Sequence, residues 1–325
     1  MFGLKNFGNI AMKRSFYFII GIMFFALSAD YLIAQTRNIG KEYYLNINRG
    51  DIHFINNGNI DSCLYYYEKA FKIGTPFSND YYQLAEYYLK LRDYASATNY
   101  LKKACLLGRN LKERDSSSSF YYVFCSTDYI KTRFYVDYRN SCDSLYSEFK
   151  KNLNLDFAYL VQSIFGGDQL IRRLNSNIDY KPYDSLNYVE IFYYINENGF
   201  PDFHFLDPET ITSFKWLYHH FRNYPDNYLN FKLEKLYYKA FADGLVDNLT
   251  LVSALDYFSL NTTGKQLFGS YTKMRNDSTY FEEFLFDNID SVRAEYSLGP
   301  LLLTKIMYEK TILPEKYIYR DYYSK

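Results

Sequence analysis

A single histidine, His220, is the side chain best suited to chemistry, because carboxylates and arginines recur around it at wide intervals in the second half of the chain. A histidine acts as a general base when a carboxylate orients its ring, and a nearby arginine can hold an anionic group. In this interpretation the base is His220, the orienting carboxylate is Asp168, Asp256 or Asp290, and the anion is held by Arg172 or Arg293. Such a site would belong to a hydrolase or a lyase.

A structural interpretation explains the same residues without catalysis. Asp168 and Arg172 are four positions apart, which is the spacing of an ion pair on one helix face. Asp290 can cap a helix, and His220 can pack beside Trp216, one turn away on the same helix. We favour this interpretation and keep the enzyme as the alternative.

Other signals of catalysis or metal binding are absent from the sequence. It contains no nucleophile elbow, phosphate-binding loop, dinucleotide-binding glycine motif or paired-histidine zinc motif. His219 and His220 are adjacent, so on a helix they point about 100° apart and cannot ligate one metal together. We therefore predict neither a metal site nor a cofactor.

The segments that carry these residues have the apolar spacing of helices. From about residue 156, helices are predicted for the stretches that contain residues 160–172, 188–196, 208–221, 228–241 and 248–257. Asp207 and Pro208 have the residue types of a helix cap and a first helical position. Gly264 and Gly269 enclose a loop or a small β-hairpin, placed at about residues 262–272.

The polar residues of this half also have the order and spacing of a known pattern. The series is Asp168-Gln169-x-x-Arg172, Gly199-Phe200-Pro201, His220, Asp256, residues 264–269 and Asp290-Ser291-Val292-Arg293-Ala294. Over about residues 160–305 it resembles a bacterial domain of unknown function whose pattern runs Asp-Gln-x-x-Arg, Gly-Trp-Pro, Gln-His, Leu-x-Asp-Arg, Gln-x-Tyr-Gly-Thr-Gln and Val-Asp-x-Arg-Arg. The resemblance implies no particular activity. Phe200 replaces the Trp and His219 the Gln, so any site built from these residues would be weakened in this chain.

The first half of the chain contains an internal period of 34 residues. Its second copy has Tyr81, Leu84, Ala85, Tyr88, Ala97, Leu101 and Ala104, and its first copy has Cys63, Tyr67 and Ala70. These residues resemble tetratricopeptide repeats at about residues 44–77 and 78–111. The first copy departs from the pattern at Gly50, where a leucine is usual. After a polar insert at 115–119, helices at about 120–138 and 141–155 would form a third, degenerate hairpin or a cap.

The repeat resemblance implies a binding face. The first helix of each hairpin would line the concave side with Leu45, Ile52, Ile55, Tyr82, Glu86 and Leu89, which we take as candidate peptide-binding residues. A basic clamp for a peptide carboxylate is absent. Equally, the same side chains could pack against the rest of this chain.

The N-terminus has the pattern of an export signal. Lys13 and Arg14 precede the apolar run 16–29, and Ala34 comes before a polar segment, so cleavage is expected near Ala34–Gln35. The run is too short to span a bilayer, so a membrane association would need an uncleaved signal. With 37 basic and 37 acidic residues the chain has no net charge, which argues against a nucleic-acid partner.

Export would allow the four cysteines, Cys63, Cys105, Cys125 and Cys142, to form disulfides. Cys63 and Cys105 fall about eight positions out of step on parallel helices, on the order of 12 Å along the axis, so they cannot pair. We expect buried free thiols.

The sequence thus predicts an all-α protein in three parts. Residues 1–35 are an export signal, 36–155 a tetratricopeptide-like solenoid and 156–325 a helical domain. The expected role is that of a bacterial scaffold, periplasmic or extracellular, that binds a protein or peptide partner.

Overall fold

The structure, a computed structural model, describes residues 38–109, 128–174, 179–221, 227–247, 249–270, 272–275, 278–281, 284–286, 288–301 and 311–312. The chain divides into two compact units, residues 1–38 and 39–325, and all described residues except Asn38 belong to the second. The predicted export signal lies outside the described residues. Among the helices described, none is both long and apolar enough to cross a membrane.

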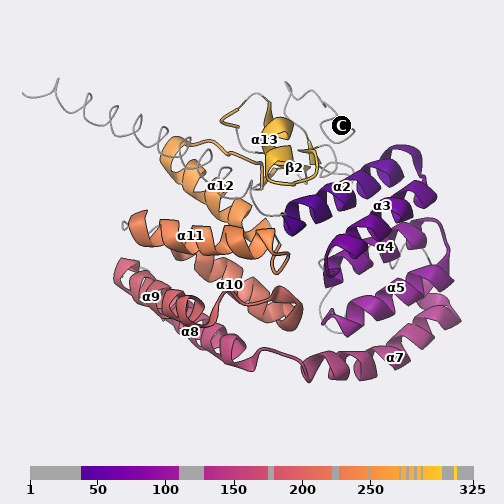
Figure 1. The fold of residues 1–325 in the computed structure, drawn as a ribbon, viewed down its shortest axis with the longest axis horizontal. Coiled ribbons are helices and arrows are strands. Elements are labelled where there is room, and N and C mark those ends of the chain that lie inside the picture. The colour runs from indigo at the N-terminus through magenta and orange to yellow at the C-terminus, as the bar shows by residue number, and fades with distance from the viewer. Residues whose placement is uncertain are drawn as a thin grey trace, which may run out of the picture. The chain divides into compact units, whose positions relative to one another are not determined.

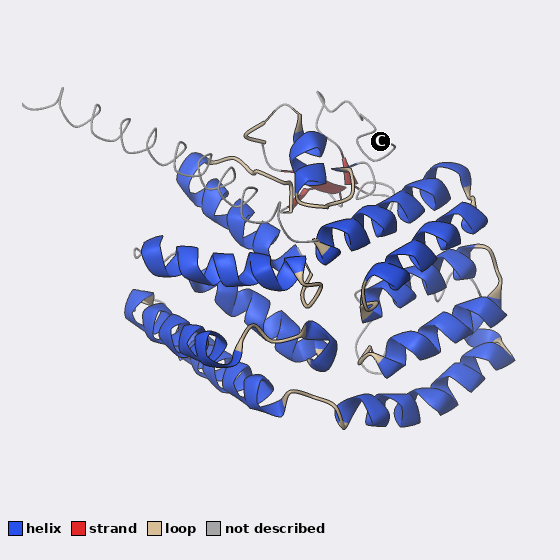
Figure 2. Cartoon of the chain, in the orientation of Figure 1, coloured by secondary structure: helices blue, strands red, loops and turns tan. Residues whose placement is uncertain are grey.

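The described chain consists almost entirely of helices, as Figure 1 and Figure 2 show, which confirms the all-α fold class. The helices are α2 (Ile39–Asn57), α3 (Ile60–Ile73), α4 (Ser78–Lys90), α5 (Tyr94–Leu106), α7 (Arg133–Lys150), α8 (Leu155–Leu174), α9 (Lys181–Asn198), α10 (Pro208–Phe221), α11 (Asn227–Ala242), α12 (Leu249–Thr263) and α13 (Ile289–Glu295). Short 3-10 helices are η1 (Tyr129–Lys131) and η2 (Phe203–Phe205).

A small sheet follows α12. Its strands are β1 (Thr272–Arg275), β2 (Ser278–Phe281) and β3 (Thr311–Ile312), with β1 antiparallel and β3 parallel to β2. Of the two alternatives for residues 262–272, the structure has the loop, and the hairpin follows it, because pairing begins only at Thr272, opposite Phe281. Gly264 and Gly269 have φ of +74° and +73°, so they make the turns of a loop that leads into the hairpin.

The first four helices that the structure describes form two helical hairpins, α2 with α3 and α4 with α5. Ala97, Leu101 and Ala104 on α5 are completely buried, as the close helix contacts of the 34-residue period require. The hairpins agree with the expected elements, whereas a tetratricopeptide solenoid stays a prediction.

Gly50, the departure from the repeat pattern, has a packing reason. A Cβ at this position would lie 2.7 Å from a ring carbon of Tyr67 on α3, so only glycine lets the ring pack directly against α2. This approach brings the Tyr67 hydroxyl to the carboxylate of Asp51, 2.6 Å away, inside the hairpin. The irregular residue of the first copy thus positions a buried polar contact.

Helix α7 packs against α5 and corrects two predictions. It runs without a break through residues 139–140, where a turn between two helices was expected, since no glycine or proline interrupts it there. It also places Cys142 opposite Cys105, with a Cα–Cα distance of 5.8 Å, and the two form a disulfide. The expectation of free thiols is wrong for this pair. Cys63 is a buried free thiol, and Cys125 lies outside the described residues.

Helices α8 to α12 surround a core rich in aromatic rings, with Phe157, Tyr188, Phe214 and Tyr237 completely buried. Asp207 caps α10 as predicted, because its carboxylate accepts hydrogen bonds from the amides of the first turn. Helix α2 also contacts α11, so the predicted boundary at residue 155 falls inside one compact unit. The division at that residue stays a prediction.

Candidate functional site

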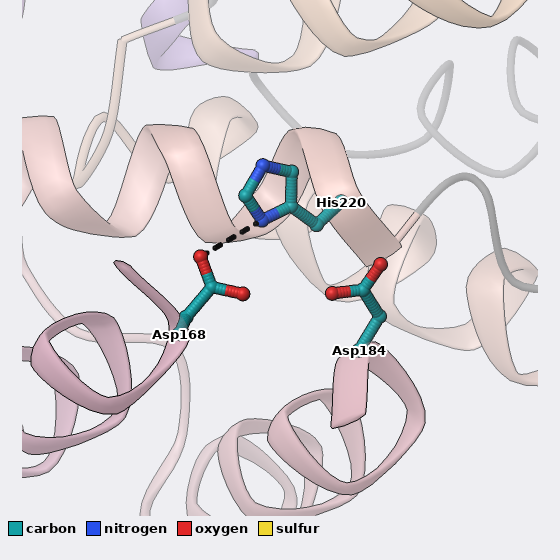
Figure 3. Close-up of side chains that lie close together, drawn as sticks. All are labelled: Asp168, Asp184 and His220. Carbon is teal, nitrogen blue, oxygen red and sulfur yellow. Dashed lines mark ion pairs between the residues drawn. The ribbon is translucent and has the colours of Figure 1, made fainter. Parts of the chain in front are cut away.

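Four polar side chains from three helices converge where α8, α9 and α10 meet. Helix α8 contributes Asp168 and Arg172, α9 contributes Asp184 and α10 contributes His220. Figure 3 shows the two carboxylates and the imidazole facing a common centre. We call these four residues the ionic cluster.

The guanidinium of Arg172 occupies that centre. Its Nε lies 3.0 Å from both carboxylate oxygens of Asp168, and its Nη2 lies 2.9 Å from Asp168 Oδ1. The same Nη2 donates to Asp184 Oδ1 and lies 3.1 Å from His220 Nδ1. The ring of Tyr180 covers the guanidinium, with its centroid 4.6 Å from Cζ. Arg172 therefore joins three helices through one planar cation.

The two carboxylates of the ionic cluster differ in acidity. Burial would raise the pKa of Asp168, but hydrogen bonds and charge from His220 and Arg172 outweigh it and lower the pKa to about 2. Burial raises the pKa of Asp184, and the attraction of Arg172 only partly offsets it. Asp168 is therefore held ionised, and Asp184 is the carboxyl that more readily takes up a proton.

Three atoms of the ionic cluster have the arrangement of metal ligands. Asp168, Asp184 and His220 each offer one ligand atom, and these atoms lie within 4.8 Å of one another. Two carboxylates and an imidazole suit a divalent transition metal. However, Arg172 Nη2 bonds the same groups, so a metal ion would first have to displace the guanidinium. The ligand set is already engaged by a cation of the chain itself.

His220 has the partial geometry of an oriented base. Its Nδ1 lies 3.4 Å from Asp168 Oδ2, and its side chain is partly exposed. The predicted neighbour Trp216 instead makes its ring contact with His219, at 6.0 Å between centroids. His220 therefore contacts Asp168 and Arg172 on α8, and Trp216 does not make the contact with His220 that was expected.

Asp256, Asp290 and Arg293 belong to a different part of the fold. The Asp256 carboxylate accepts hydrogen bonds from the amides of Leu267, Phe268 and Ser270, at 2.6, 2.8 and 2.6 Å. Arg293 donates to the carbonyls of Gly299 and Phe268, and Asp290 accepts from the Leu301 amide. These side chains hold the backbone of the loop before β1 and of the segment after α13.

The structure thus divides the residues that the sequence grouped together. Arg172 reaches beyond Asp168, its partner on the same helix, and bonds Asp184 on α9. Sequence reasoning missed Asp184. A signal for it existed, because Asp184 falls in helical period with the buried Tyr188 and Ile191 of α9, and a carboxylate on such a stripe needs a partner.

The candidate peptide-binding residues are largely covered by the chain itself. Leu89 is completely buried, and Tyr82 and Glu86 are nearly so. Leu45, Ile52 and Ile55 are half-buried on α2. Only these last three remain partly accessible on the predicted concave face.

A groove of about 750 Å³ lies elsewhere, between the N-terminal hairpins and α10. One wall contains Tyr44, Phe77, Asn79, Asp80, Arg109 and Tyr146, and the other contains His204, Asp207, Glu209, Thr212, Lys215 and Asp247. Arg109 connects this groove to the predicted face, because its guanidinium stacks 3.7 Å from the ring centroid of Tyr82. Tyr82 therefore packs against Arg109, a residue of the groove wall, and does not line the groove itself.

Comparison of the chain with known protein families, known proteins and solved structures gave no match.

Proposed function

We propose that this chain is an exported, non-enzymatic scaffold that binds a polypeptide segment in the groove between its N-terminal hairpins and α10. The observation that carries the proposal is the groove itself. Its volume of about 750 Å³ is in the range of pockets that enclose most of a small ligand, so it suits a short segment and not a folded domain.

The charges of the groove favour a peptide over a strongly charged ligand. Lys215 Nζ lies 3.0 Å from Asp247 Oδ2, so the two opposite charges largely compensate each other. Asp207 is engaged in capping α10. Arg109 remains at the wall, where a guanidinium can donate to the carbonyls or a carboxylate of a peptide.

The wall beside α10 is held in a fixed position. The His204 ring stacks on Phe77 with centroids 4.1 Å apart, and its Nε2 lies 3.0 Å from the Thr75 carbonyl oxygen. Its Nδ1 lies 2.6 Å from Asp202 Oδ1. Because these contacts hold the His204 ring in one position, less conformational entropy is lost when a peptide binds beside it.

Two observations support export. The apolar run after Lys13 and Arg14 has the form of a signal segment. The pairing of Cys105 with Cys142 suits an oxidising compartment, since disulfides are rare where thiols are kept reduced. Sequencing the N-terminus of the exported protein tests this part, and a chain that still begins at Met1 or Met12 would contradict it.

Selection from a displayed peptide library, with the chain from residue 36 onward as bait, tests the groove. Thr212→Trp fills it from α10, because Thr212 is exposed and lines it. Ser147→Trp is the matched control, since Ser147 is exposed on α7 and, like Thr212, donates to the carbonyl four residues earlier at 2.7 Å. We expect selected peptides to bind Ser147→Trp normally and Thr212→Trp at least about tenfold more weakly. Equal binding to both variants, or no selected peptide, would refute the proposal.

A hydrolase or lyase at the ionic cluster is the second candidate, supported by the proximity of His220 to Asp168. In that function the Asp168 carboxylate orients the ring and the second nitrogen of His220 takes a proton from substrate or water. Turnover of chromogenic esters, phosphoesters or glycosides that disappears in His220→Asn would favour it. The absence of turnover in the unmodified chain would leave the scaffold as the function.

A further inference from the structure

The outward face of α8 exposes large apolar side chains that the described chain does not cover. The exposed fractions are 48% for Leu155, 70% for Tyr159, 56% for Leu170 and 74% for Leu174. They lie at helical spacing near the two ends of a 20-residue helix. Exposed apolar side chains that share one helix face commonly mark an interaction site.

The middle of the same face is unusually open. Gly166 and Gly167 are exposed, and a Cβ added to either would have no atom within 4 Å outside the backbone of the helix. Glycine weakens a helix interior by about 1 kcal/mol relative to alanine, and here no contact within the described chain requires it. Ser163 lies on the same face one turn before Gly166 and is also exposed. The small residues leave room for the backbone of another helix.

The face also has opposite charges at its two ends. Asp156 is exposed in the first turn of α8 and Arg173 in the last. No ion pair joins either of them to another residue in the part of the chain that the structure describes. Both charges are therefore available to a partner.

These residues are complementary to a second, antiparallel copy of the same helix. A twofold axis at the midpoint between Ile164 and Phe165 places Asp156 level with Arg173 of the other copy along the helix axis, within the reach of the long arginine side chain. The same axis places Tyr159 opposite Leu170 and Leu155 opposite Leu174. Ser163 then faces Gly166 at the crossing point, where the two backbones come closest. In an interface with twofold symmetry each of these contacts occurs twice.

We infer that two copies of this chain associate through the outward face of α8, with the two helices antiparallel and crossing at Ser163 and Gly166. The occupant is a second copy because the charges and apolar residues match when the face is turned upon itself. This association goes beyond the proposed peptide binding and does not depend on the groove.

Sedimentation velocity of the chain from residue 36 onward, over a concentration series, measures the association. We expect a monomer–dimer equilibrium, and we expect Gly166→Trp to raise the dissociation constant at least about tenfold by separating the helices. Val136→Trp, at an exposed position of α7, is the control and should leave the dissociation constant unchanged. Circular dichroism melts of the variants show whether each one is folded.

Charge exchange identifies the pairing. Asp156→Arg alone and Arg173→Asp alone each place like charges in contact twice and should weaken self-association. The two variants mixed together should form a heterodimer, and the double exchange in one chain should restore the homodimer. If these charges serve only the α8 dipole, the double exchange is the least favourable variant and mixing has no effect.

Three results would overturn the inference. One is a chain that stays monomeric at every concentration, and another is a dimer that Gly166→Trp leaves as tight as before. The third is a dimer in which neither mixing nor the double exchange restores what the single exchanges weaken.

Discussion

The buried carboxyl group of Asp51 should make the stability of this protein decline between about pH 4 and pH 7. Asp51 lies inside the first hairpin, where the hydroxyls of Tyr67 and Tyr87 both donate to its Oδ1, at 2.6 and 2.7 Å. Burial raises the pKa of the carboxyl to about 7, and the two hydroxyl hydrogen bonds only moderate the rise. The folded protein therefore binds a proton that the unfolded chain has lost.

The size and sign of the effect follow from this difference. The pKa rises from 3.8 to about 7, and each unit corresponds to about 1.36 kcal/mol, so the contribution is on the order of 4 kcal/mol. A raised carboxyl pKa gives stability that is complete below pH 4 and is lost as the pH rises to about 7. Asp51→Asn keeps an oxygen that accepts from both tyrosines but does not ionise. The variant should match the unmodified chain near pH 4 and exceed its stability at pH 8.

Urea denaturation of the full chain at pH 4, 6 and 8 measures this prediction. Asp80, whose pKa is raised to about 6 by burial, contributes in the same direction, so Asp51→Asn should keep part of the decline. Asp61→Asn, at an exposed position of α3, is the control and should follow the profile of the unmodified chain. A profile that Asp51→Asn leaves unchanged would refute the buried-carboxyl argument.

Three further predictions concern the ionic cluster, a buried helix contact and the disulfide. Arg172→Ala leaves two buried carboxylates without their cation and should cost roughly 3 kcal/mol of unfolding free energy in urea, with His220→Ala costing less than half as much. An Arg172→Ala variant as stable as the unmodified chain would mean that the ionic cluster is not structural. Ala104→Leu overpacks a completely buried helix contact and should cost about 1–3 kcal/mol, seen as a lower melting temperature. Reduction of the bond between Cys105 and Cys142, which are 37 residues apart, should cost up to roughly 4 kcal/mol, and an identical melt with and without reductant would contradict the disulfide.

Local patterns in the sequence were sufficient to predict the fold class and several contacts. The 34-residue period placed Ala97 and Ala104 at a close helix contact, and both are completely buried on α5. The i,i+4 spacing likewise predicted the Asp168–Arg172 pair, since residues four apart on a helix are always neighbours.

Contacts between distant segments were decided by the tertiary structure. The packing of α9 against α8 brings Asp184 to Arg172, and the packing of α7 against α5 brings Cys142 to Cys105. The 34-residue period predicts neither pairing. The insert at 115–119 interrupts the period before α7, and the period ends before α9. The sequence grouped Asp256 with His220, but the partners of Asp256 are backbone amides of the loop before β1. Those amides reach its carboxylate only when the loop is folded. The sequence therefore determined the all-α class and the polar pair within one helix, whereas helix packing determined which polar groups from distant segments meet.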